Sequence, residues 1–176
     1  AVADHLTTPL MAALTGLPEQ APENRPSVAS RVRELTARNL SVSPIDADGS
    51  VIRYHALFRE FLLKTFLAQR TSGAVRKRYA VAARYFKAAG DPVRAVDLWI
   101  ESGRADKAVR EIESCSQRLI AQGRTQTLLR WMLALPKSAA DRPWFLFARA
   151  VACRYNDPPA ALMLYERAYK GFCRDR

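Results

Sequence analysis

The chain is 176 residues long, and its shares of hydrophobic (49%) and charged (26%) residues are near those of globular proteins, so it can bury a core without metals or disulfides. No run approaches the roughly 18 apolar residues that cross a bilayer, and no basic region followed by an apolar one opens the chain, so we expect neither a membrane partner nor a signal peptide. The net charge of +11 points to a partner that is acidic or carries phosphates.

The first seventy residues predict three helices and a β-hairpin. Apolar residues recur at helical spacing in three segments and alternate in two short ones, and Asp48-Gly49 is a hairpin-turn signal. The expected elements are a helix over 5–14, a helix over 27–39 capped by Ser27, a strand over 40–43, a turn over 46–50, a strand over 51–54 and a strongly amphipathic helix over 54–66. This order is typical of a winged helix, and we expect that domain over residues 1–70.

The rest of the chain predicts helices and no strand. Apolar stripes at helical spacing are separated by glycines and by two Asp-Pro breaks, which favours stacked helical hairpins. The expected helices cover about 75–86, 92–100, 105–119, 125–135, 143–155 and 158–172. Residues 143–176 span 34 positions, the tetratricopeptide period. We therefore expect a mainly α chain, with an arm of irregular hairpins over 71–142 and a tetratricopeptide-like repeat over 143–176 that begins a sensor array.

Residue types that carry chemistry are sparse. The chain has no phosphate loop of the GxxxxGK[ST] type and no nucleophile–base–orienter set, and its two histidines lie far apart in sequence. Cys115, Cys153 and Cys173 are widely spaced without a CxxC pair, which favours a reduced, cytoplasmic protein with cysteines in the core. We expect neither an enzyme nor a metal site in this chain.

Positive charge is concentrated in residues 51–94, which contain ten basic and two acidic residues. The candidate contact patch consists of Arg70, Arg76, Lys77, Arg78, Arg84 and Lys87. Such a band can meet phosphates or an acidic partner surface. The alternative is a solvated helix face beside an acidic neighbouring domain.

Two further readings concern aromatic and basic residues. Trp131 and Trp144 are candidates to line a groove for a ligand or partner, with packing in the core as the alternative. In the helix over 27–39, Arg31 and Arg38 share a face, as in a DNA-recognition helix. The first fifty residues carry a net charge of −2, a poor footprint for phosphates, so we do not expect this segment to bind nucleic acid directly.

Three stretches together resemble one family. They are Arg53-Tyr54-His55-Ala56-Leu57-Phe58-Arg59-Glu60-Phe61-Leu62, then Ala88-Ala89-Gly90-Asp91-Pro92, and finally Gly123 with Thr127 to Pro136 around Trp131. In this order they resemble the MalT-like regulators, which are ATP-dependent, LuxR-type transcription activators of the class called signal-transduction ATPases with numerous domains. The resemblance extends over nearly the whole chain.

The resemblance implies a larger protein with an ATPase domain first, then the winged helix, a helical arm, a tetratricopeptide-like sensor and a DNA-binding helix-turn-helix. The chain would cover the winged helix, the arm and the start of the sensor, and the absence of an initiator Met agrees with a fragment. The ATPase and DNA-binding domains would then be its partners, with an inducer or a regulatory protein at the sensor. ATP and ADP would be cofactors of the parent protein, and we expect none in this chain.

His55 is the residue that the resemblance singles out. In related switches a Met-His-Asp motif stands here, and its histidine contacts the β-phosphate of ADP; in this chain Tyr54 replaces the Met and Ala56 the Asp. An imidazole N–H can donate to a phosphate oxygen. His55 is therefore the candidate nucleotide sensor of the intact protein, and the alternative is a histidine that caps its helix or packs at an interface.

The sequence thus predicts a regulatory fragment that couples nucleotide state to the sensing of an inducer or partner. One alternative is a free-standing helical-repeat adaptor that binds a protein. A second is a DNA-binding winged helix with a helical tail.

Overall fold

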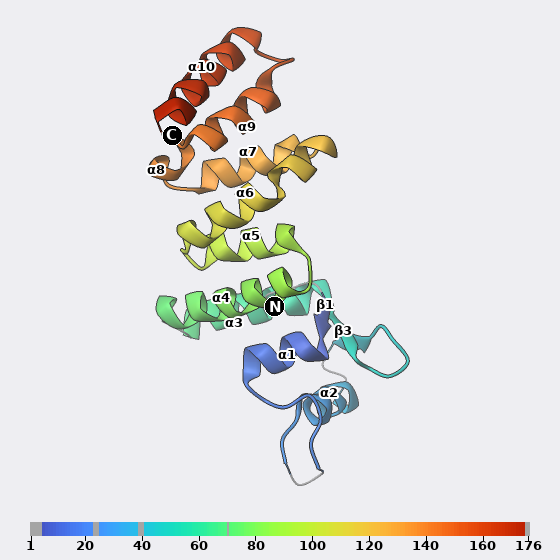
Figure 1. The fold of residues 1–176 in the computed structure, drawn as a ribbon. Helices are drawn as coiled ribbons and strands as arrows, with labels where there is room; N and C mark the ends of the chain where they lie inside the picture. Colours follow the sequence, from blue (N-terminus) through green and yellow to red (C-terminus); the bar gives the residue numbers. More distant parts are fainter. Residues whose placement is uncertain (1–4, 23–24, 39–40, 70, 175–176) are drawn as a thin grey trace. The chain divides into compact units, whose positions relative to one another are not determined.

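The computed structural model describes residues 5–22, 25–38, 41–69 and 71–174, and the chain divides into two compact units, Ala1–Ala88 and Ala89–Arg176. The fold is mainly helical, with one small sheet in the first unit (Figure 1). The predicted fold class, a winged helix followed by helical pairs, is confirmed at this level. The predicted boundaries after residues 70 and 142 stay predictions.

The sheet has three antiparallel strands in the order β1-β3-β2, with β1 at His5–Thr7, β2 at Val42–Pro44 and β3 at Val51–Tyr54. The predicted hairpin and its turn are present, and Gly49 in the turn has a positive φ of 69°. The prediction of a helix from His5 is wrong at its start. His5–Thr7 pairs with β3 instead, and α1 begins only at Thr8.

The late start of α1 (Thr8–Thr15) has a local cause. The Thr7 hydroxyl oxygen accepts a hydrogen bond from the Leu10 N–H at 3.3 Å, so Thr7 is the N-cap, and Pro9 occupies the first turn. The helix ends at Gly16, whose φ of 76° is the left-handed conformation that glycine adopts readily. Helical spacing of the apolar residues does not reveal this boundary.

Helix α2 (Val28–Ala37) begins at the predicted cap. Ser27 and Ser30 each accept a hydrogen bond from the other's backbone N–H, at 3.1 and 3.0 Å, which forms a capping box. Val28 and Val32 are the buried side chains of this helix. Asn39, the last residue of the predicted helix, lies outside the described residues.

The core of the first unit lies under the sheet and along α4 (Ser72–Ala88). Leu6, Leu10 and Ile52 are at most 5% exposed, and α4 buries one stripe of apolar residues that ends at Phe86. A hydrogen bond of 2.8 Å between the hydroxyls of Thr7 and Tyr85 ties α4 to the end of β1. The expected helix over about 75–86 is confirmed and extends further at both ends.

Helix α3 (Ala56–Gln69) departs from the expectation of a strongly amphipathic helix with a buried face. It forms where predicted, but it contains no fully buried side chain, and Leu57 and Phe61 are 71% and 60% exposed. The prediction of a strong amphipathic pattern is therefore wrong, because apolar residues lie on several sides of this helix. Its apolar surface remains largely open in the first unit.

The second unit consists of the helices expected from the sequence, with one addition. The helices are α5 (Pro92–Glu101), α6 (Ala105–Ala121), α7 (Thr125–Ala134), α8 (Lys137–Ala140), α9 (Pro143–Cys153) and α10 (Pro158–Arg174). Asp91 caps α5, since its carboxylate accepts the Arg94 N–H at 3.1 Å. The short α8 was not predicted, because four residues are too few for a periodic pattern.

Successive helices of the second unit pack side by side in Figure 1, most extensively α9 against α10. Trp131, Phe145 and Ile112 are at most 1% exposed and lie at its centre. Cys115 is buried, as a core cysteine should be, but Cys153 is half-buried and Cys173 is exposed, which corrects the expectation for these two. No helix among the described residues is long and apolar enough to cross a membrane.

Candidate functional site

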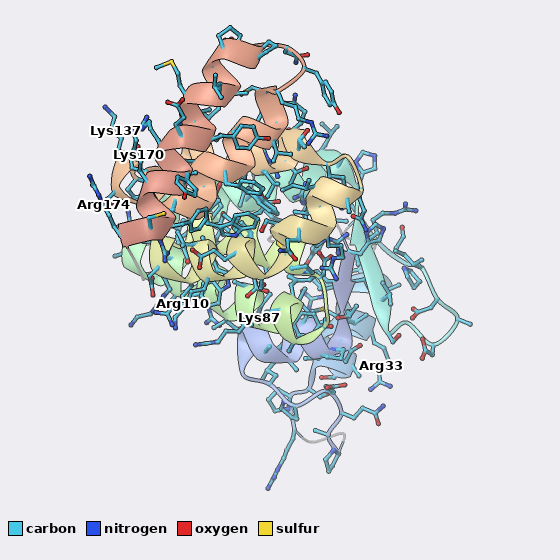
Figure 2. All side chains as sticks on the ribbon, turned by 45° about the horizontal axis from the view of Figure 1, so that its top comes forward. Arg33, Lys87, Arg110, Lys137, Lys170 and Arg174 are labelled. Atoms are coloured by element: carbon cyan, nitrogen blue, oxygen red, sulfur yellow. The ribbon has the colours of Figure 1, made fainter. Side chains whose placement is uncertain are left out.

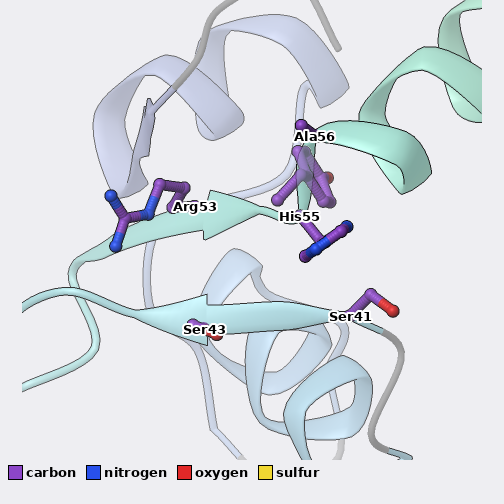
Figure 3. A pocket seen from close by; sticks show the side chains of 6 residues that line it. Ser41, Ser43, Arg53, His55 and Ala56 are labelled. Carbon is purple, nitrogen blue, oxygen red and sulfur yellow. The ribbon is translucent and has the colours of Figure 1, made fainter.

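A pocket of about 510 Å³ opens where β3 ends and α3 begins (Figure 3). It is lined by Ser41, Ser43, Arg53, Tyr54, His55 and Ala56. The two segments that build it come from either side of the hairpin turn. The pocket therefore depends on the pairing of β2 with β3, not on one stretch of sequence.

Strand register decides which side chains line the pocket. Ser43 lies opposite Arg53, and the His55 N–H donates to the Ser41 carbonyl oxygen at 2.9 Å, which continues the ladder past the last paired strand residue. Side chains alternate between faces along a strand and share a face across it. Arg53, His55, Ser41 and Ser43 therefore lie on the open face, while Ile52 and Val42 point into the core.

His55 occupies the junction between strand and helix. Its carbonyl oxygen accepts the Arg59 N–H at 2.9 Å, the first hydrogen bond of α3, so His55 precedes the helix as its N-terminal flanking residue. Its side chain is exposed, and Figure 3 shows the imidazole beside Ser41. The backbone of His55 thus starts the helix while its ring remains available to a ligand.

Ser41 adopts a backbone conformation that L-residues rarely take, with a φ of 54°. In this conformation its carbonyl oxygen accepts the His55 N–H, and the residue lines the pocket. A left-handed residue other than glycine is a pointer to function when it sits in a site. Here the Ser41 backbone, just before β2, is hydrogen-bonded to His55, whose imidazole is exposed.

The pocket carries positive charge and has no acidic residue in its lining. None of its lining residues is acidic, and no carboxylate of the described residues is ion-paired with Arg53. Guanidinium, imidazole and hydroxyl groups are all donors to an anionic oxygen. The pocket is thus chemically suited to an anion such as a phosphoryl group, and no group of metal ligands is found among the described residues.

The opposite side of β3 is apolar. Burial raises the pKa of the Tyr54 phenol, and the Tyr54 ring packs edge-on against Phe58, with their centroids 6.0 Å apart. Tyr54 therefore anchors the start of α3 to the sheet. This packing holds the neighbouring His55 at the rim of the pocket.

The predicted basic patch lies on α4. Arg76, Lys77, Arg78, Arg84 and Lys87 are all exposed, and Lys87 is labelled in Figure 2. Arg70, the remaining member, lies outside the described residues. The side chains that α4 buries are all apolar, so the basic residues do not contribute to the core.

The two tryptophan candidates are not equivalent. Trp131 is 1% exposed, and its indole N–H donates to Asp97 at 2.7 Å, so its ring has no open face for a ligand. Trp144 is half-buried and stacks on Phe147, which contacts Tyr165, with centroid distances of 5.2 and 5.8 Å. Trp131 thus has the packing role that was its alternative, and Trp144 belongs to an aromatic cluster at the surface of α9 and α10.

The basic residues of α2 are engaged within the helix. Glu34 forms salt bridges with both Arg31 and Arg38, each at 2.9 Å. The two arginines that share the candidate recognition face are thus engaged by one carboxylate within the helix. The geometry therefore gives no support to DNA reading by α2.

Sequence reasoning identified His55 but missed Arg53, Ser41 and Ser43 as its neighbours. The signal available was the polar alternation of Ser41 and Ser43 about Val42 and of Arg53 and His55 about Tyr54. Alternation shows that each pair shares a face. It does not show that the two faces are the same one, since that depends on register.

Comparison with known proteins adds to this geometry. Residues 1–74 match the family model of the MalT winged helix domain. The match covers the MalT-like winged helix through the pocket and α3 and ends in the first turn of α4. No curated protein and no solved structure matches the chain. The match supports a MalT-like regulator fragment as the source of these residues.

Proposed function

We propose that the chain is the regulatory part of an ATP-dependent, LuxR-type transcription activator of the signal-transduction ATPase class. In this proposal the winged helix responds to the bound nucleotide, and the helical pairs respond to an inducer or a partner protein. The observation that carries the proposal is the pocket at the strand-to-helix junction, where His55 and Arg53 line one cavity. The family match over residues 1–74 supports it.

The chemistry of the pocket fits the phosphates of ADP. An imidazole and a guanidinium donate to phosphate oxygens, and the first N–H groups of α3 lack intrahelical acceptors and favour negative charge. A phosphate at His55 would join the winged helix to a nucleotide held by the ATPase domain. The closed, ADP-bound form would then be favoured by the additional contacts it makes, which is a population shift.

The open apolar surface of α3 supports a covering domain. Leu57 is 71% exposed and Phe61 is 60% exposed, and they lie about one helical turn apart near the start of α3. Large apolar side chains gathered at the surface mark sites of association. In the proposal, the ATPase domain covers this surface in the closed state.

The helical pairs fit a tetratricopeptide-like sensor in spacing and packing. Ala161 and Ala168 are at most 3% exposed on α10, and Gly171 lies against Pro143 of α9, so small residues let the two helices approach closely. Pairs of this kind build concave binding surfaces when repeated. The basic side chains of α4 would contact another domain or a regulatory protein.

The first experiment is to read the coding sequence on both sides of this segment. An upstream ATPase with a phosphate loop and a downstream helix-turn-helix are expected. Stop codons close to both ends would overturn the proposal.

The second experiment measures ADP release from the intact protein. Replacing His55→Gln should speed ADP dissociation about tenfold or more, because a charge-assisted hydrogen bond to a phosphate is lost. The control is Arg33→Gln on α2, which alters an exposed side chain outside the pocket. Equal rates in the wild type and the His55→Gln variant would show that His55 is not a nucleotide sensor.

A free-standing adaptor is the second candidate, and one observation favours it. Helix α10 exposes Leu162, Met163 and Tyr169, which are 61%, 66% and 71% exposed. Such a face suits a protein partner. Stop codons at both ends together with a stable complex of this chain with another protein would favour this reading.

A further inference from the structure

A row of polar and basic side chains crosses the open face of the sheet. Strand register places His5, Arg53 and Ser43 opposite one another on β1, β3 and β2. Cβ atoms of directly opposite residues lie about 4.5–5.5 Å apart on the same face. All three residues are exposed. The sheet thus brings both histidines of the chain to one face, which their distance in sequence did not suggest.

Arg53 and His55 flank the same pocket. They are two residues apart on β3, so their Cα atoms are separated by roughly 7 Å along the strand. In Figure 3 the Arg53 guanidinium extends along the sheet away from His55, so the two donor groups stand at opposite ends of the cavity. Ser41 lies across from His55, and Ser43 lies opposite Arg53. A ligand that engages both ends must be longer than one phosphoryl group.

The charge of Arg53 is not neutralised by the chain as described. Arg31 and Arg38 share the carboxylate of Glu34, whereas no described carboxylate pairs with Arg53. A guanidinium presents a planar fork of donors that matches phosphate geometry. An exposed arginine of this kind at the rim of a pocket without acidic residues is suited to an anion.

We propose that Arg53 is a second phosphate-binding residue, so that the pocket takes a diphosphate group with one phosphoryl at His55 and its neighbour at Arg53. The inference rests on the proposed nucleotide-sensing role of His55. The ligand class is therefore the diphosphate of a nucleoside diphosphate. Ser41 and Ser43 donate hydroxyl hydrogen bonds to the same oxygens.

The test uses the 176-residue chain and inorganic pyrophosphate as the probe. Pyrophosphate and orthophosphate are titrated separately, at low ionic strength, into isotopically labelled protein observed by NMR. Pyrophosphate should shift the backbone signals of Ser41, Ser43 and Arg53 and the ring signals of His55. It should bind more tightly than orthophosphate, since only the longer anion reaches both ends of the pocket.

Variants separate the two donors. Arg53→Gln should weaken pyrophosphate binding about tenfold, the effect of losing one charge-assisted hydrogen bond, and should remove the preference over orthophosphate. Arg53→Lys should retain part of the affinity, because it keeps the charge without the fork. The matched control is Arg33→Gln on α2, an exposed arginine outside the pocket that carries the same change in charge.

Three outcomes would overturn the inference. In the first, His55→Gln weakens binding and Arg53→Gln does not, which leaves the nucleotide-sensing proposal standing. In the second, Arg33→Gln weakens binding as much as Arg53→Gln, or the NMR signals of the pocket residues do not respond to pyrophosphate. The role of His55 is then tested separately by ADP release from the intact protein. In the third, duplex DNA shifts the same signals more strongly and with a steep salt dependence, as on a nucleic-acid surface.

Discussion

At the scale of single residues, a few polar contacts organise each unit. Asp97 accepts hydrogen bonds from the Trp131 indole N–H at 2.7 Å and from the Arg130 guanidinium at 2.8 Å. The tryptophan is buried, whereas the Arg130 side chain is 64% exposed. The two bonds should therefore differ in what they contribute to stability, because solvent screens the second.

Trp131→Phe should lower the free energy of unfolding by about 2 kcal/mol, since a part-buried hydrogen bond to a carboxylate is lost and a small cavity forms. Arg130→Gln should cost less than about 1 kcal/mol, as expected for an exposed ion pair. Urea denaturation followed by circular dichroism measures both. Equal losses of unfolding free energy in the two variants would contradict the view that the bond of Asp97 to Trp131 contributes more than its bond to Arg130.

Asp46 organises the hairpin turn. The Ser50 hydroxyl and the Val51 N–H both donate to its carboxylate, and these hydrogen bonds hold the pKa of Asp46 below its usual value. A lowered folded-state pKa means that the carboxylate stabilises the fold above its unfolded pKa. That stabilisation is lost as the pH falls through the folded pKa.

Ser50→Ala should raise the pKa of Asp46 toward its usual value, because the variant removes the hydrogen bond that lowers this pKa the most. The carboxyl carbon signal of Asp46, followed by NMR during an acid titration, reports this change. Ser43→Ala is the control, since Ser43 lies in the same hairpin but is paired with Arg53, away from the turn that Asp46 opens. An unchanged titration midpoint in Ser50→Ala would show that the hydroxyl does not set the pKa.

At the scale of elements, close packing of α9 and α10 depends on one glycine. A Cβ atom built on Gly171 would lie 2.5 Å from Cγ and 3.0 Å from Cβ of Pro143. Both neighbours belong to a ring that cannot rotate away, so the helices themselves would have to separate. The usual gain in helix propensity from replacing glycine is therefore opposed by a clash.

Gly171→Ala should destabilise the chain by roughly 1–3 kcal/mol, as overpacking does. The control is Gly73→Ala in the first turn of α4, where nothing lies within 4 Å of the added Cβ. That variant should be neutral or stabilising by up to about 1 kcal/mol, the helix-propensity difference. Thermal unfolding of both variants decides the point, and a stabilised Gly171→Ala would refute the close contact.

At the scale of the whole molecule, the excess of positive charge is a property of exposed side chains. Arg76, Lys77 and Arg78 lie exposed in succession on α4, within the segment where the positive charge is concentrated. Charge of one sign gathered on a helix attracts an acidic surface and raises the rate of association. Its effect should weaken as salt shortens the screening distance.

Replacing these three residues by Gln should weaken binding of the chain to polyglutamate about tenfold at low salt, because three exposed pairs contribute a few tenths of a kcal/mol or more each. Fluorescence anisotropy of a labelled polyglutamate measures the affinity. The control replaces Arg104, Lys107 and Arg124 by Gln, which removes the same charge from exposed positions in the second unit. Equal weakening by both triple variants would show that net charge matters and position does not.

Local patterns in the sequence determined most of the helices of this protein. Ser27 caps a helix at the predicted position, Asp91 of a predicted Asp-Pro break precedes α5, and Gly16, Gly103 and Gly123 follow predicted helix ends with positive φ. Such signals act over a few residues, so they can be read without knowing the fold. The family resemblance at His55 was likewise carried by a contiguous motif.

Tertiary structure alone decided the rest. His5–Thr7 became a strand because β3 offered an unpaired edge, and α3 kept an open apolar surface because no element of the first unit buries it fully. The juxtaposition of Arg53 and His55 with Ser41 and Ser43 depends on strand register, and that of His5 with Arg53 on a pairing across almost fifty residues. Pairing and burial join distant segments, so no local pattern reveals them.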